Sequence, residues 1–146
     1  GVGALGGGQG ASAEGFAPDV EAEANGLFQR VYTGGASVDE LVASLHALRA
    51  TSDGRSQEVV ACVVHNLFEE YRFFPKYPDR HLHISAHLFG ALIEHELVAS
   101  ITLGMFLRYV LEAVRKGPEH RMFAFGVVAL DRFKRRVPEW PQYCAQ

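Results

Sequence analysis

The chain has 146 residues, of which 48% are hydrophobic, and this length and composition suit one compact domain. Its formal net charge of -3 excludes a basic field over the whole chain, although a local basic patch stays open. Cys62 and Cys144 are too few and too far apart for a disulfide framework, which predicts a reducing compartment. No apolar run reaches the ~18 residues of a membrane span, so no membrane contact is expected.

The beginning of the chain is rich in Gly and Ala and has little to bury. This composition predicts a flexible linker over residues 1–18 and a folded domain over residues 19–146. Because the sequence does not begin with Met, we interpret it as a piece of a longer chain. Gly1, Gly3 and Gly6 match the dinucleotide pattern G-x-G-x-x-G, but no strand precedes them and no helical pattern opens on them, so no cofactor is predicted.

Helical periodicity dominates the rest of the sequence. Ser37 and Glu40 form a capping-box pattern at one helix start, and Pro75 stops another helix. No segment shows strand alternation between turn signals, so the predicted class is all-α. Short loops favour a stack of antiparallel helical hairpins, as in HEAT-like or MIF4G-like α-solenoids, with a compact bundle as the alternative. Six helices are predicted, over residues 19–32, 37–50, 55–74, 80–95, 97–116 and 120–136, before a proline-broken tail.

Two patterns deserve comparison with catalytic and metal sites. His83 and His87 lie four residues apart, as in a zinc pair, but Ile84 stands where the protease motif needs Glu, and no third ligand is placed by the sequence. Cys62 and His65 lie in an apolar helical run without an orienting acid or an oxyanion donor. We therefore predict neither a metal site nor an enzyme.

A basic segment near the C-terminus could contact RNA phosphates. Its cations also fall in the last turn of a predicted helix, where the helix dipole favours positive charge. The local interpretation is preferred because the chain as a whole is acidic. The segment comprises Arg132, Lys134, Arg135 and Arg136.

The helix over residues 55–74 is apolar on two sides. Its expected core face holds Val60, Val63, Val64, Leu67, Phe68, Tyr71 and Phe74. A second stripe holds Val59, Cys62, Asn66 and Phe73, with Glu70 between the two. Such a helix needs cover on both sides, either from neighbouring helices of a solenoid or from a partner that fills a groove.

The helix over residues 97–116 has a similar pattern. Opposite its core face, Ile101, Met105 and Tyr109 alternate with Arg108 and Glu112. Apolar side chains rimmed by charges are typical of binding surfaces, and Met adapts to varied ligands. The two charged residues could equally pair with each other. The expected core face holds Leu103, Phe106, Leu107, Val110, Leu111 and Val114.

Four long motifs, NLFEEYRFFPKYPDRHLHI, LRYVLEAVRK, FGVVALDRFK and PQYC, resemble a helical segment of the large scaffold subunit of the CCR–NOT mRNA deadenylase complex. In animals this segment is the tristetraprolin-binding domain, and the resemblance covers about residues 19–146. It implies a HEAT-like fold without catalysis, whose hydrophobic groove receives a short helical peptide of tristetraprolin. Further implied partners are the other CCR–NOT subunits, bound through the rest of the parent chain. The implied location is the cytoplasm, P-bodies included, with the nucleus as a second compartment.

The sequence departs from the animal pattern at His87, at Gly90-Ala91, at Phe123-Ala124 and at Trp140. Ala124 replaces a ring that could have lined the groove, so the identity of the adaptor stays open. We predict that Asn66 binds a peptide backbone, Glu70 a basic side chain and Phe73 an apolar one. Met105, Arg108, Tyr109, Phe123 and Phe125 complete the predicted peptide-binding set. The alternatives are a structural spacer without a ligand and direct RNA binding.

Overall fold

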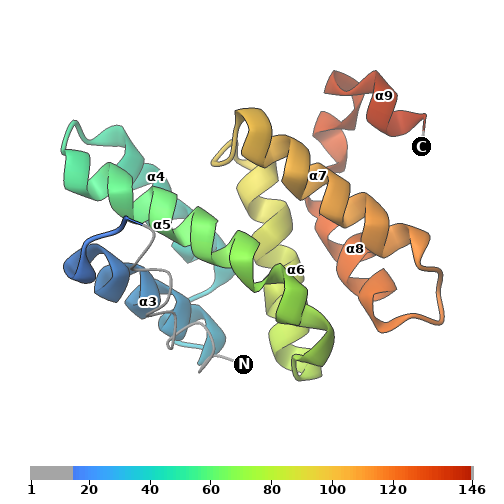
Figure 1. Cartoon of the computed structure of the whole chain (residues 1–146), viewed down its shortest axis with the longest axis horizontal. Coiled ribbons are helices and arrows are strands. Elements are labelled where there is room, and N and C mark those ends of the chain that lie inside the picture. Colours follow the sequence, from blue (N-terminus) through green and yellow to red (C-terminus); the bar gives the residue numbers. More distant parts are fainter. Residues whose placement is uncertain (1–14, 146) are drawn as a thin grey trace. The chain divides into compact units, whose positions relative to one another are not determined.

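The computed structural model describes residues 15–145, apart from the side chain of Cys144. The glycine pattern at Gly1, Gly3 and Gly6 and most of the predicted linker lie outside these residues. Within the described residues every regular element is helical, which confirms the predicted all-α class (Figure 1). The elements are α3 (Pro18–Tyr32), α4 (Val38–Ala50), α5 (Gly54–Glu70), the 3₁₀ helix η1 (Tyr71–Lys76), α6 (Asp79–Glu94), α7 (Ser100–Arg115), α8 (Arg121–Phe133), the 3₁₀ helix η2 (Lys134–Glu139) and α9 (Pro141–Cys144).

Helix starts follow local capping chemistry. The predicted capping box is confirmed, because Glu40 N donates to Ser37 Oγ at 3.0 Å and Ser37 N donates to Glu40 Oε1 at 2.8 Å. At the start of α8, Met122 N donates to Nδ1 of His120 at 3.0 Å. These bonds satisfy backbone N–H groups that have no partner inside their helices.

The chain divides into two compact units, with the boundary inside α6 between Ile84 and Ser85. In unit 1, α5 packs against α3 and α4 around fully buried Phe28, Leu45 and Leu67 (Figure 1). In unit 2, α7 and α8 form a packed pair. None of the described helices combines the length and the apolar content needed to span a bilayer.

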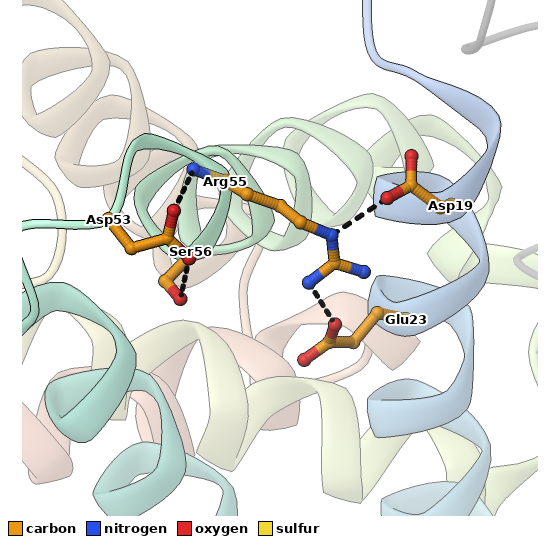
Figure 2. Close-up of polar contacts among 5 residues, drawn as sticks. All are labelled: Asp19, Glu23, Asp53, Arg55 and Ser56. Carbon is orange, nitrogen blue, oxygen red and sulfur yellow. Dashed lines mark hydrogen bonds and ion pairs between the residues drawn. The ribbon is translucent and has the colours of Figure 1, made fainter.

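A polar clamp joins the starts of α3 and α5 in unit 1 (Figure 2). Arg55 Nε donates to Asp19 at 2.7 Å, and its Nη1 donates to Glu23 at 2.8 Å. Asp53 caps α5 by accepting from Arg55 N at 3.2 Å and from Ser56 Oγ at 3.0 Å. The hydrogen bond from Arg55 lowers the pKa of Asp19, and that from Ser56 lowers the pKa of Asp53. The clamp fixes α3 and α5 with their first turns adjacent.

Unit 2 has an aromatic centre and two close helix contacts. The Phe89 ring stacks on Phe106 at 4.1 Å and meets Phe125 edge-on at 5.4 Å. A Cβ added to Gly90 would lie 2.5 Å from the carbonyl oxygen of Ala129, and one added to Gly126 would lie 2.8 Å from Val114. Glycine is therefore required at both positions, because any side chain would separate the packed helices.

Three predicted helix boundaries were wrong. The α-helix predicted to reach Phe74 ends at Glu70, and η1 follows it; the helix predicted to reach Arg136 ends at Phe133, and η2 follows it. Each 3₁₀ helix contains a proline, Pro75 or Pro138, which has no N–H to donate to the carbonyl four residues earlier. The α-helix therefore gives way to a 3₁₀ helix before the proline. 

The third correction concerns the start of α7, which begins at Ser100 instead of Leu97. Glu96 and Ser100 both have positive φ angles, of 60° and 56°, so a right-handed helix cannot extend back from Ser100 to Leu97. Leu97 and Val98 between them are buried, so this connection is part of the hydrophobic core.

Candidate functional site

Three of the predicted peptide contacts lie at the end of α5 and in η1, and the two on α5 are buried. Asn66 is buried, and its Nδ2 donates to Cys62 Sγ at 3.5 Å. Glu70 is also buried and accepts a 2.6 Å hydrogen bond from the Tyr77 hydroxyl. Both side chains therefore face their own chain, and their role toward a peptide stays a prediction.

Burial sets the electrostatics of this region. Burial raises the pKa of Glu70, and the hydrogen bond from Tyr77 opposes that shift. The pKa of Cys62 rises to about 12, first because of burial and then because of the charge of Glu21. A thiol with such a pKa is protonated at neutral pH and is a poor nucleophile. 

Phe73 differs from its neighbours in η1. It is 42% exposed, and the Arg72 guanidinium lies over its ring at 4.9 Å from the centroid. Phe74 beside it is completely buried. Phe73 is therefore an exposed apolar side chain, whereas Val59, Cys62 and Asn66 of the same predicted stripe are buried. Its role as an anchor for a peptide stays a prediction.

The larger exposed surface belongs to α7 in unit 2. We call Ile101, Met105, Arg108 and Glu112 the outer face of α7. Ile101 is 77% exposed and Met105, one turn further, is 44% exposed. Arg108 Nε contacts Glu112 at 3.1 Å, so these two charges pair with each other, one of the alternatives raised from the sequence.

The remaining predicted contacts are partly or wholly covered. Tyr109 on α7 and Phe123 on α8 are half-buried. Phe125 is buried against Phe89, which places it in the core of unit 2 and not at its surface. Ala124, where the animal pattern has a ring, is exposed.

A pocket of about 750 Å³ lies beside the outer face of α7 and is called here the α7–α9 pocket. One wall comes from α7 and the other from the end of η2 and from α9. Its lining consists of Gly104, Leu107, Arg108, Leu111, Glu112 and Arg115 on α7, and of Glu139, Trp140, Pro141, Gln142 and Tyr143.

The aromatic wall of this pocket is held in place by the rest of unit 2. Arg136 donates to the carbonyl of Ile93 at 2.6 Å and to both oxygens of Glu139 at 3.0 Å. Its guanidinium also lies over the Trp140 ring at 4.9 Å. Phe133, which is fully buried, contacts the rings of Trp140 and Tyr143 edge-on or tilted, at 6.2 and 6.4 Å.

Sequence reasoning missed this pocket. The proline pattern predicts only a broken tail in this part of the chain, and helical spacing assigns Leu107 and Leu111 only to a core face. The available signal was the pair of rings, Trp140 and Tyr143, in a segment too short to bury them by itself.

The basic segment is mostly engaged within unit 2. Lys134 contacts Asp131 at 2.8 Å, Arg136 contacts Glu139 at 3.0 Å, and Arg132 lies 3.8 Å from Glu94. Arg132 lies in the last turn of α8 and Lys134 is its C-cap, as the local interpretation expected, and the ion pairs give three of the four cations a partner in addition. The two histidines considered as zinc ligands lie on α6, where His83 is exposed and His87 half-buried. Among the described residues, no group of three or more His, Cys, Asp or Glu side chains is arranged to hold a metal ion.

Three comparisons with known proteins converge on one family. Residues 5–146 match the family model described as "CCR4-NOT transcription complex subunit 1 TTP binding domain". The chain is 40% identical over 129 residues to "General negative regulator of transcription subunit 1" of Schizosaccharomyces pombe, and 36% identical over 131 residues to "CCR4-NOT transcription complex subunit let-711" of Caenorhabditis elegans. These alignments cover 88% of this chain but only 6% and 5% of the relatives, so the chain corresponds to a small part of each of them.

A solved structure shares the fold. The chain superposes on "N-Terminal domain of the yeast Not1" with a TM-score of 0.84 and 33% sequence identity, over 90% of this chain and 25% of that one. The similarity extends through nearly all of the chain. The chain therefore belongs to the family of the TTP-binding domain of CCR4-NOT transcription complex subunit 1.

Proposed function

We propose that this domain is a non-catalytic scaffold module that docks short helical motifs of RNA-binding adaptor proteins. Docking would bring the deadenylase of the parent complex to the transcripts that the adaptors bind, for poly(A) shortening, decay and translational repression. Membership in a family named for TTP binding carries this proposal. The cytoplasm, P-bodies included, is the proposed place of action.

Exposed apolar side chains form a surface on which a helical peptide could dock. Ile101 and Met105 are one helical turn apart on α7, which is the spacing at which an amphipathic helix presents its anchors. The spacer alternative requires neighbouring helices to fill both apolar stripes, yet Phe73, Ile101 and Met105 are exposed in the described part of the chain. This exposure supports docking over a spacer.

Direct RNA binding is the weaker proposal. It requires cations free to contact phosphates, and three of the four basic side chains near the C-terminus already face carboxylates of unit 2. A peptide ligand needs no such charges.

Calorimetric titration of the 146-residue chain with the C-terminal peptide of tristetraprolin tests the proposal. Met105→Asp should weaken binding about tenfold, because it places a charge where an apolar anchor would be covered. Val127→Asp is the matched control, since Val127 is 43% exposed against 44% for Met105 but lies on α8. Phe73→Asp probes the anchor in unit 1.

The results separate the alternatives. Weaker binding by Met105→Asp or by Phe73→Asp, with Val127→Asp unchanged, supports docking at the corresponding surface. Absence of binding by the wild-type chain would overturn tristetraprolin-type peptides as its ligand. Tight, salt-sensitive binding of oligo(A) instead would favour the RNA-binding function.

A further inference from the structure

We propose that the α7–α9 pocket binds an acidic segment of a partner protein, which inserts an apolar side chain between α7 and Trp140 and places a carboxylate at Arg115. This inference rests on the proposed function insofar as it names the chemistry of a docked motif. It assigns that motif to a different surface from the predicted contacts on α5 and η1.

The walls of the pocket suit an apolar side chain. Leu107 and Leu111 project from α7, while Trp140 and Tyr143 stand on the opposite wall. The volume of about 750 Å³ lies within the range of sites that enclose organic ligands, ~300–1,000 Å³. The aromatic wall is preformed, because Arg136 and Phe133 hold Trp140 in place. Little ordering cost is therefore expected on binding.

The charged side chains at the pocket favour a ligand with a negative charge. Glu112 is paired with Arg108, and Glu139 is paired with Arg136. Of the charged side chains that line the pocket, Arg115 alone has no ion pair within the described residues. Arg136, which is not part of the lining, neutralises Glu139, and Arg108 neutralises Glu112, so the positive charge of Arg115 is left for a ligand carboxylate to meet.

A second polar group at the pocket also lacks a partner. The hydroxyl oxygen of Tyr143 is buried and makes no hydrogen bond with any described residue. Burial raises the pKa of Tyr143 to about 12, so the hydroxyl keeps its proton and can donate to an acceptor. A carbonyl or carboxylate oxygen of the incoming segment would satisfy this donor.

The setting of the pocket favours a polypeptide over a small molecule. Arg108 and Glu112 belong both to its lining and to the outer face of α7, which continues to exposed Met105 and Ile101. A helical segment could fill the pocket with one side chain and cover this apolar face with others one turn away. A small carboxylate would leave the outer face of α7 uncovered.

Trp140 makes the inference directly measurable, because it is the single tryptophan of the chain. The probes are two synthetic amphipathic helical peptides that contain no Trp or Tyr. Both carry leucines at the same positions of their apolar face. In the turn beside these leucines, one peptide has glutamate and the other has lysine. Each is titrated into the 146-residue chain while Trp140 fluorescence is recorded, and calorimetry gives the affinity. Arg115→Glu is the test variant, and Lys116→Glu, an exposed neighbour that does not line the pocket, is the charge-matched control.

We expect the glutamate peptide to shift the Trp140 emission and to bind about tenfold more tightly than the lysine peptide. Arg115→Glu should invert this preference, while Lys116→Glu should keep it. Equal binding of the two peptides, a preference insensitive to Arg115→Glu, or unchanged emission would overturn the proposal. Circular dichroism of each variant confirms that its helices are intact.

Two further outcomes are distinguishable. If Met105→Asp weakens the tristetraprolin peptide while neither probe changes the Trp140 emission, adaptor docking stands and the pocket assignment fails. If a free fatty acid shifts the emission as strongly as the glutamate peptide, the pocket takes small carboxylates and the polypeptide assignment fails.

Discussion

Both compact units contain a six-residue 3₁₀ helix with proline at its fifth position, followed by an aromatic residue and a second proline. In unit 1 the sequence is Pro75-Lys76-Tyr77-Pro78, and in unit 2 it is Pro138-Glu139-Trp140-Pro141. The backbone bond is also shared, because the aromatic residue donates its N–H to the carbonyl three residues before it, at 3.0 Å in unit 1 and 2.9 Å in unit 2.

The two rings have different surroundings. Tyr77 is buried and donates to buried Glu70, whereas Trp140 is half-buried, lies under Arg136 and lines an open pocket. The same local device therefore closes a core in one unit and forms one wall of the α7–α9 pocket in the other. What differs is the set of neighbours that the tertiary fold supplies.

The interiors differ as well. Of the four buried polar side chains among the described residues, Glu21, Asn66 and Glu70 belong to unit 1. Unit 2 instead brings helices together through Gly90 and Gly126, which have no room for a Cβ. Unit 1 is thus sensitive to lost hydrogen bonds, and unit 2 to added volume.

The largest expected effect comes from adding one methyl group in unit 2. Gly90→Ala should reduce the free energy of unfolding by about 3 kcal/mol, the upper end of typical overpacking costs, because the new Cβ meets a backbone carbonyl oxygen that cannot move independently. Urea unfolding followed by circular dichroism measures this change.

Two glycines with open space provide controls. Gly104→Ala in α7 and Gly26→Ala in α3 should each stabilise the chain by about 0.5–1 kcal/mol, because alanine favours helix and nothing lies within 4 Å of the added Cβ. A Gly90→Ala variant as stable as these two would contradict the close-packed contact.

A smaller effect is expected from removing one hydroxyl group in unit 1. Tyr77→Phe should cost about 2 kcal/mol, because it leaves the buried Glu70 carboxyl without its donor. Trp140→Phe, at the corresponding position in unit 2, should cost less than about 1 kcal/mol, because the ring is partly exposed and the smaller ring keeps part of its contacts with Arg136 and Phe133. Equal losses of stability in the melting curves of the two variants would contradict the distinction between the buried ring of Tyr77 and the half-buried ring of Trp140.

The prolines should give matched effects. Pro75→Ala and Pro138→Ala should each cost about 0.4–1 kcal/mol, because alanine increases the conformational entropy of the unfolded chain while the 3₁₀ backbone already suits proline. Comparison of the two denaturation midpoints tests whether the devices are equivalent. A loss confined to one unit would show that only that proline is compatible with its native backbone.

The smallest effect is a pH dependence. Because burial raises the pKa of Glu70 in the folded chain, its contribution to stability is present below the unfolded pKa of about 4.3 and is lost as pH rises through the folded value. The Glu70→Gln variant has no titrating carboxyl at this position. Its free energy of unfolding relative to wild type should therefore increase from about pH 4 to about pH 7, the range over which Glu70 of the wild type loses its proton.

The lowered pKa values of Asp19 and Asp53 act in the opposite direction, since their stabilisation is lost as pH falls through the folded pKa. Both aspartates are present in the wild type and in Glu70→Gln, so their effects cancel in the difference between the two. A difference that shrinks toward neutral pH would contradict a raised pKa for Glu70.

Parts of the candidate site were predictable from helical spacing. The exposed side of α7 with Met105 and Arg108 follows from short-range patterns. The burial of Asn66, Glu70 and Phe125 did not follow, because a helical wheel gives a direction relative to one axis and not the neighbours in that direction. The wheel also assumes ~100° per residue, which no longer holds in η1, where each residue turns ~120°.

The sequence by itself determined what depends on neighbours along the chain, namely the all-α class and the capping box at Ser37 and Glu40. It offered the pairing of Arg108 with Glu112 as one of two alternatives. Only the tertiary structure decided that Tyr77 closes on Glu70 while Trp140 faces a pocket. Capping and helical pairing depend on residues three or four positions apart. Burial of a ring depends on segments that lie tens of residues away in the sequence and pack on it in the fold. The residues next to the ring do not indicate which segments these are.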